Sequence, residues 1–170
     1  RIAPDMPDLR YVVVGAGPDL GRLKAQVTDS SLEGNVVFAG KVSQRELSAY
    51  YALCDIFIMP SRPSDRFEGF GLVYAEAGAY GKPVIAGRTG GVPEVVQDGH
   101  NGILVDPMDV DGLERAIRSL LSNPGLARSM GCNGRRQVME RFNILRMAES
   151  TLQVVCEREG RPKHGGGPGA

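Results

Sequence analysis

No tryptophan occurs among the 170 residues, and aromatic residues make up only 6% of the sequence. Apolar residues nevertheless reach 42%, so a core must be built mainly from aliphatic side chains and alanine, as is usual in α/β domains. A chain of this length corresponds to about one domain and is long enough to bury a sizeable core.

Neither sign of charge is in excess, because 20 Lys and Arg residues balance 20 Asp and Glu residues. A general polyanion binder needs a basic excess, so nucleic acid is not an expected partner. No apolar run reaches the ~18 residues of a membrane-spanning helix, and no signal peptide is recognised. The three cysteines are odd in number and lack metal-ligand spacing, so we expect reduced thiols in a cytoplasmic protein.

Short apolar runs alternate with segments of helical periodicity along the chain. The runs predict strands at residues 10–15, 35–40, 55–59, 83–86 and 102–105. The periodic segments predict helices at 19–27, 43–54, 71–80, near 96, and at 110–121, 125–141 and 144–159. This alternation predicts a Rossmann-like α/β fold, a parallel sheet with helices on both faces. Ligands of such sheets bind beyond the carboxyl ends of the strands, so the loops there are the first places to search.

The first of these loops contains Gly-Ala-Gly at residues 15–17. A dinucleotide-binding fingerprint would add a third glycine and an acidic residue about 20 residues further on. Leu20 stands where the third glycine is required, and no acid ends the next strand. Two interpretations therefore remain open: a tight strand-to-helix turn, or a turn at which the backbone approaches a nucleotide.

A more specific signal is the segment Glu-Gly-Phe-Gly-Leu at residues 68–72, which opens a predicted helix carrying Glu76. The free N–H groups and positive dipole of a helix start favour a diphosphate, and glycines allow close approach to the backbone. Because the helix around Glu76 is small and apolar, we expect its carboxylate to be partly buried and to need donors such as ribose hydroxyls. The alternatives are a solvated helix face for Glu76 and, for Glu68, an acid favoured only by the dipole.

A second glycine-rich loop, Gly-Gly-Val-Pro-Glu at residues 90–94, is expected at the same edge of the sheet. Its Glu94 is better explained as a first-turn acid favoured by the helix dipole than as a ligand. His100 has no Cys, Asp or Glu cluster around it, so no metal site is expected.

Together these residues resemble glycosyltransferase family 4, retaining enzymes of the GT-B fold. The resemblance covers about residues 8–155, and its most specific elements are Glu68 and Glu76, separated by seven residues, with the loop at 90–94. It implies the C-terminal, donor-binding half of an enzyme that transfers a hexose from a UDP- or GDP-linked donor to a glycan or lipid. The loops before Glu68 and at residues 86–91 are similar to those of mannosyltransferases that use GDP-mannose and lipid acceptors.

The resemblance also implies roles for single residues. Glu68 would hold the donor sugar and stabilise an oxocarbenium-like transition state, and Glu76 would bind the ribose. The sugar diphosphate would lie against Gly69, Phe70, Gly71 and Leu72, and the nucleotide base against the loops of Gly15, Gly17, Lys41 and Val42. No metal and no cofactor besides the donor is implied, because helix N-termini and basic side chains neutralise the leaving diphosphate.

Enzymes of this family open their donor domain with a strand and a Gly-Arg…Lys segment, and this chain starts after that segment. We therefore expect residues 1–159 to be a partial nucleotide-sugar-binding domain and residues 160–170 to be a flexible tail. The strands at 10–15 and 55–59 would then not be hydrogen-bonded neighbours, and the chain by itself would be poorly stable and inactive. Its further partner would be the N-terminal acceptor-binding domain of the same enzyme, through which any peripheral membrane contact would be made.

Two other classes of protein stay open. A non-transferase Rossmann domain would bind a dinucleotide such as NAD in preference to UDP or GDP. A GT-B sugar-nucleotide epimerase or a phosphorylase would share the fold, although a phosphorylase needs a phosphate or cofactor site that the sequence does not show.

Overall fold

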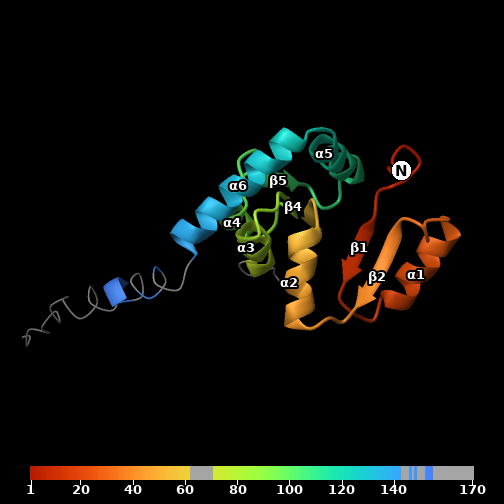
Figure 1. Cartoon of the computed structure of the whole chain (residues 1–170), viewed down its shortest axis with the longest axis horizontal. Coiled ribbons are helices and arrows are strands. Elements are labelled where there is room, and N and C mark those ends of the chain that lie inside the picture. Colours follow the sequence, from red (N-terminus) through yellow and green to blue (C-terminus); the bar gives the residue numbers. More distant parts are fainter. Residues whose placement is uncertain (62–70, 143–145, 147, 149–151, 155–170) are drawn as a thin grey trace, which may run out of the picture.

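The computed structural model describes residues 1–61, 71–142, 146, 148 and 152–154. Five strands and six helices alternate along these residues (Figure 1). In chain order they are β1 (Tyr11–Val14), α1 (Leu20–Asp29), β2 (Val36–Gly40), α2 (Gln44–Leu53), β3 (Phe57–Met59), α3 (Leu72–Ala79), β4 (Val84–Gly87), α4 (Val92–Val95), β5 (Gly102–Val105), α5 (Val110–Ser122) and α6 (Pro124–Arg141). Each lies within a few residues of a predicted element, whereas the helix predicted at 144–159 falls largely outside the described residues.

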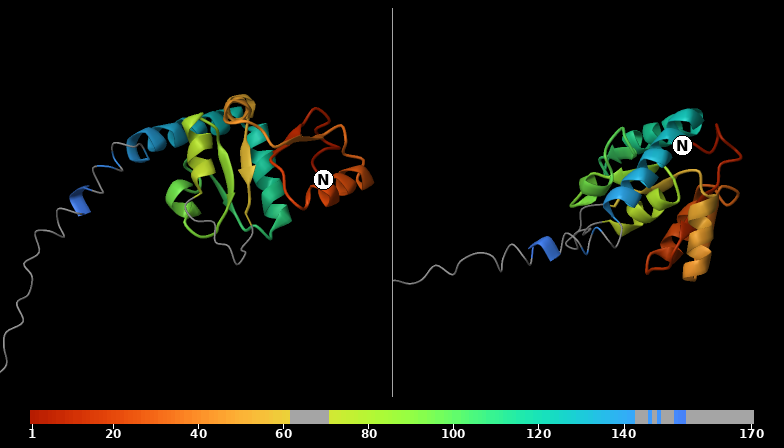
Figure 2. Two further views of the ribbon diagram at one scale, coloured as in Figure 1. Left: turned by 90° about the horizontal axis from the view of Figure 1, so that it is seen from below. Right: turned by 60° about the vertical axis from the view of Figure 1, so that its left-hand side comes forward.

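All strand pairs are parallel, which confirms the predicted α/β class. The strands β3, β4 and β5 form one sheet in that order, with Ile85 of β4 opposite Ile58 and Ile103. Successive residues of β4 face opposite sides, so Ile85 packs with α5 and α6 while Val84 and Ala86 pack with α3 and α4. Figure 2 shows the yellow-green α3 and the teal α5 on the two sides of these strands.

The strands β1 and β2 form a separate two-stranded sheet. In the described part of the chain, Val12–Val14 do not pair with residues 56–58, as expected. Figure 1 places β1, α1 and β2 together at one end of the molecule, and we call them the N-terminal unit. No side chain of residues 1–50 is fully buried, and Val12 and Val37 are 39% and 47% exposed.

The segment before β1 is attached to helix α5 by ion pairs. Arg118 binds Asp5 at 2.7 Å and Glu114 at 2.8 Å, and Arg1 pairs with Asp111. Exposed pairs of this kind contribute little free energy individually. These ion pairs therefore attach the segment that leads into the N-terminal unit only weakly to α5.

Helix α6 packs very closely against α3 and the turn that follows it. An ideal Cβ on Gly131 would lie 2.0 Å from the carbonyl oxygen of Gly81, so only glycine allows this approach. Nearby, the buried amides of Asn101 and Gln137 hydrogen-bond each other at 2.6 Å, and both donate to the carbonyl of Val95. These contacts join α6 to α4, to the turn after α3 and to the segment that leads into β5.

Candidate functional site

The loops that follow β3 and β4 meet at the carboxyl ends of these two strands. An added Cβ on Gly87 would lie 2.7 Å from the carbonyl oxygen of Ser61, which shows how closely the two loops approach. Residues 62–70 follow, so the predicted site residues Glu68, Gly69 and Phe70 lie outside the described residues. Their roles stay predictions.

Gly71 stands immediately before α3 with φ +74°, in the left-handed region that favours glycine. A Cβ at this position would also lie 2.6 Å from the ring of Tyr74, so backbone strain and packing both require glycine here. No side chain of the described residues caps the helix start. The Tyr74 N–H donates to the Gly71 carbonyl at 3.0 Å, whereas the N–H groups of Leu72 and Val73 have no intrahelical partner among the described residues. This end of α3 therefore favours anions.

Glu76 is exposed, and the expectation that it is partly buried is wrong. Helix α3 buries Tyr74, Ala75, Ala77 and Gly78, whereas Leu72 and Glu76, one turn apart, share its outer face. The small residues around Glu76 pack against α6 and β4 on the inner faces and leave this stripe uncovered. Glu76 is nevertheless not a free surface acid, because its Oε2 accepts a hydrogen bond from the Tyr51 hydroxyl at 2.8 Å.

The second group of predicted residues lies at the carboxyl ends of β1 and β2. The Gly15 N–H donates to the Gly40 carbonyl at 2.8 Å, and this bond joins the two loops. Gly15 and Gly40 have φ of +134° and +70°, and no other atom lies within 4 Å of a Cβ built on either. Gly15 and Gly17 thus have open space beside their backbone, and the bond from Gly15 to Gly40 joins this turn to the loop of exposed Lys41 and half-buried Val42.

The structure therefore brings the predicted residues together in two groups. One comprises the loops of Gly15, Gly17, Lys41 and Val42 in the N-terminal unit, and the other comprises Gly71, Leu72 and Glu76 at α3. No hydrogen bond or ion pair among the described residues joins the two groups.

Sequence reasoning missed two side chains near the α3 group. Tyr51 lies 25 residues before Glu76, and only the packing of α2 against α3 brings them into contact. Thr89, in the loop after β4, has a buried hydroxyl without a partner among the described residues. In the sequence, only its position directly before the two glycines of the predicted loop at residues 90–94 could have indicated Thr89.

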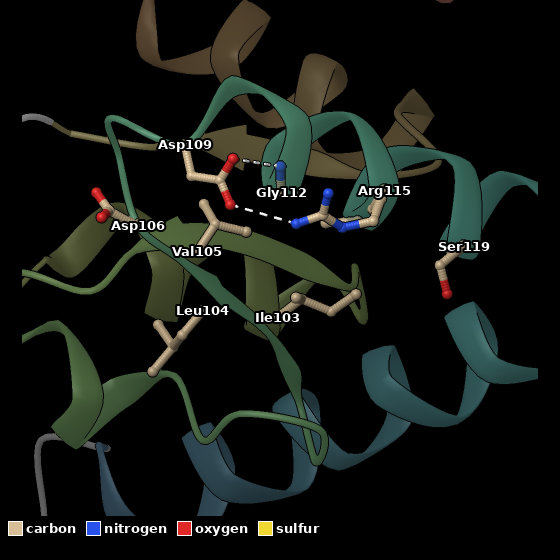
Figure 3. A pocket seen from close by; sticks show the side chains of 9 residues that line it. Ile103, Leu104, Val105, Asp106, Asp109, Gly112, Arg115 and Ser119 are labelled. Atoms are coloured by element: carbon tan, nitrogen blue, oxygen red, sulfur yellow. Dashed lines mark hydrogen bonds and ion pairs between the residues drawn. The ribbon is translucent and has the colours of Figure 1, made fainter.

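Other hollows in the surface do not contain the predicted residues. A groove of about 400 Å³ lies between β5 and α5 (Figure 3), where Asp109 accepts from the Gly112 N–H at 2.8 Å and pairs with Arg115 at 3.3 Å. The Asp109 carboxylate is thus occupied in capping α5. An apolar hollow of about 280 Å³ lies between α1 and the β1–β2 sheet.

The described part of the chain shows no cluster of three or more His, Cys, Asp or Glu side chains that could hold a metal ion. Among the same residues, no helix has the length and apolarity that crossing a bilayer requires. Cys54 and Cys132 are free thiols.

Comparison with known proteins identifies the family. The family model "Glycosyl transferases group 1" matches residues 1–137. A GDP-mannose-dependent alpha-(1-6)-phosphatidylinositol monomannoside mannosyltransferase of Mycolicibacterium smegmatis is 41% identical over 140 residues, which are 81% of this chain and 37% of that protein. A GDP-mannose-dependent monoacylated alpha-(1-6)-phosphatidylinositol monomannoside mannosyltransferase of Corynebacterium glutamicum is 36% identical over 88% of this chain and 39% of its own length. The chain thus spans little more than a third of the length of these relatives.

Solved structures show the same fold. Sucrose-phosphate synthase of Thermosynechococcus elongatus is 32% identical, with a TM-score of 0.76 over 90% of this chain and 40% of that one. HepE of Anabaena in complex with UDP is 26% identical, with a TM-score of 0.80 over 89% of this chain and 42% of that one. The parallel sheets, the helices on both faces and these similarities lead to one conclusion: the chain belongs to the group 1 glycosyl transferases and has the α/β fold of a GT-B C-terminal domain.

Proposed function

We propose that the chain is the donor-binding part of a retaining family 4 glycosyltransferase that transfers a hexose from a nucleotide-diphosphate sugar. The observation that carries the proposal is the start of α3. Gly71 holds a left-handed conformation that no other residue fits, the helix start after it favours anions, and Glu76 follows on the exposed face.

In this proposal, the backbone of residues 69–72 binds the sugar diphosphate and the loops of Gly15, Gly17, Lys41 and Val42 bind the base. Glu76 accepts hydrogen bonds from the ribose hydroxyls. Glu68 lies against the donor sugar, where its carboxylate stabilises the positive charge that develops at the anomeric carbon. The dipole of α3 stabilises the leaving diphosphate, which removes the need for a metal ion.

Mannose is the sugar that the similarities favour. Both relatives named above use GDP-mannose, by their names, and act on phosphatidylinositol mannosides. We therefore propose GDP-mannose as the donor and a mannosylated lipid as the acceptor. HepE, which is more distant, was solved with UDP, so UDP is the comparison nucleotide in every binding test.

A further domain binds the acceptor in this proposal, because the chain spans about a third of its relatives. Reduced thiols support a cytoplasmic location, with any membrane contact made through that further domain.

The 170-residue chain in isolation is expected to be inactive and prone to aggregation. Among the described residues, β1 and β3 each pair on one side only, and unpaired strand edges are templates for wrong pairing. Size-exclusion chromatography and thermal melting, with a transfer assay, test this expectation. A monodisperse chain that melts cooperatively and binds GDP or UDP tightly would contradict it.

Replacing Glu76 by alanine in the intact protein is expected to weaken nucleotide binding by about 1–3 kcal/mol, the effect of losing hydrogen bonds to a charged group. Calorimetry with GDP and UDP measures the change. Glu140→Ala is the matched control, because Glu140 is an exposed glutamate of α6, away from both groups of site residues. Unchanged affinity in Glu76→Ala would remove Glu76 from the site, and preferential binding of NAD would favour the dinucleotide-binding alternative.

A further inference from the structure

The ring of Tyr51 is locked into the core beside the proposed nucleotide site. Its side chain belongs to α2 and is only 6% exposed. The ring stacks on Tyr80 and packs at a tilt against Phe57, with centroid distances of 5.6 Å in both cases. Packing on both sides leaves the ring no alternative rotamer of comparable energy, so the position of its hydroxyl is fixed.

That hydroxyl reaches the otherwise exposed side chain of Glu76. A glutamate on a helix surface has several rotatable bonds and loses conformational entropy when a ligand fixes it. Here the Tyr51 hydroxyl donates to Oε2 at 2.8 Å, whereas Oε1 accepts no hydrogen bond from a described residue. One carboxylate oxygen is therefore held in place and the other is available to a ligand.

The direction of this hydrogen bond does not change at physiological pH. Burial of the ring and the hydrogen bond to Glu76 both raise the pKa of the Tyr51 phenol above its ordinary value. The phenol stays protonated and acts as a donor, so the Glu76 carboxylate has a permanent partner in the absence of any nucleotide.

We propose that Tyr51 is a positioning residue, which holds one oxygen of the Glu76 carboxylate so that the carboxylate is oriented for the hydroxyl groups of a nucleotide ribose. This inference rests on the proposed function, because it takes a nucleotide as the ligand of Glu76. Tyr51 acts only through Glu76 and makes no contact with the donor itself. Preorganising the carboxylate lowers the entropy lost on binding and favours a ligand with a hydroxyl at the correct distance.

The test uses the intact protein and four variants: Tyr51→Phe, Glu76→Ala, the double variant and Tyr50→Phe. Tyr51→Phe removes one hydroxyl and keeps the buried ring with its aromatic contacts. Tyr50→Phe is the matched control, because it removes a phenol from the same helix that forms no hydrogen bond to Glu76. Calorimetry gives the Kd for GDP and UDP and for their 2′-deoxy analogues, and thermal melting is measured in parallel.

We expect Tyr51→Phe to raise the Kd of the nucleotide by about 3- to 10-fold, as for residues coupled through direct contact. The ratio of Kd values for the 2′-deoxy and ribose forms should fall towards one, while Tyr50→Phe keeps the wild-type ratio. In the Glu76→Ala background, Tyr51→Phe should cause no further loss. Both Kd values in the ratio are measured on the same variant. A lower stability of Tyr51→Phe therefore affects them equally and leaves the ratio unchanged.

Two results would overturn the positioning role while leaving the proposed function intact. In the first, Glu76→Ala weakens binding, but Tyr51→Phe keeps both the wild-type Kd and the wild-type ratio of 2′-deoxy to ribose Kd values. The other is an equal loss from Tyr51→Phe with and without Glu76, which would mean that Tyr51 acts independently of the carboxylate. Wild-type affinity in Glu76→Ala would instead refute the site itself, and the positioning role with it.

Discussion

Replacing Glu68 by glutamine in the intact protein should lower kcat by about 10²- to 10³-fold, the usual effect of removing one electrostatic contact to a transition state. Glutamine keeps the shape of the side chain and deletes its charge. If the carboxylate interacts mainly with the positive charge that develops at the sugar, its loss removes little binding free energy from the donor in the ground state. Donor affinity should therefore change far less than kcat.

Steady-state kinetics with GDP-mannose and calorimetric donor titrations separate the two effects. Asp65→Asn is the matched control, since it deletes a negative charge three residues earlier in the sequence. A loss confined to KM would make Glu68 a residue that binds donor and transition state equally. A similar fall of kcat in Asp65→Asn would show that general loss of charge, not the specific carboxylate, is responsible.

Replacing Gly131 by alanine should destabilise the folded protein by about 3–5 kcal/mol, at the upper end of the effects of single substitutions. The new methyl group would lie 2.0 Å from the Gly81 carbonyl oxygen. The methyl carbon is bonded directly to Cα and the oxygen is a backbone atom, so no side-chain rotation can relieve the clash. Helix α6 must then move away from the turn after α3, and the buried bond between Asn101 and Gln137 would be disturbed.

Urea denaturation followed by circular dichroism measures this loss. Gly125→Ala is the control, because a Cβ there would lie a tolerable 3.4 Å from Asn123 Oδ1. Alanine is also the better helix former, so this variant should be neutral or slightly stabilised. If Gly131→Ala unfolds at the wild-type urea concentration, the close approach of α6 does not have the structural role assigned to it.

Local sequence signals predicted the elements because those signals act over a few residues. The Ser43–Glu46 capping box is present in full, with the Ser43 N–H donating to Glu46 at 2.7 Å and the Ser43 hydroxyl oxygen accepting from the Glu46 N–H at 3.3 Å. The all-apolar β4 is buried at every position, as a strand covered on both faces must be. The separation of β1 from β3 was expected from the family resemblance, not from the residues themselves.

The features that sequence reasoning missed depend on which helix faces which neighbour. The small side chains of α3 correctly indicated close packing, but the pattern did not show that Glu76 lies on the uncovered stripe. The hydrogen bond from Tyr51 to Glu76 depends on how α2 and α3 pack together. The periodicity of either helix alone does not predict which of its residues meet the other helix. The separation of the site residues into two groups follows from sheet topology in the same way.

The weak attachment of the segment that leads into the N-terminal unit has a thermodynamic consequence for the proposed site. This unit carries the loops of Gly15 and Lys41, which we propose bind the base, whereas the diphosphate is proposed to bind at the start of α3. A nucleotide that contacts both must restrict the motion of one against the other, and the free energy of that restriction reduces the observed affinity. A contact that fixes the N-terminal unit in its nucleotide-bound position would therefore raise the affinity for the nucleotide. Because the coupling is reciprocal, the nucleotide strengthens that contact by the same factor. Donor affinity then becomes adjustable from surfaces that never touch the donor.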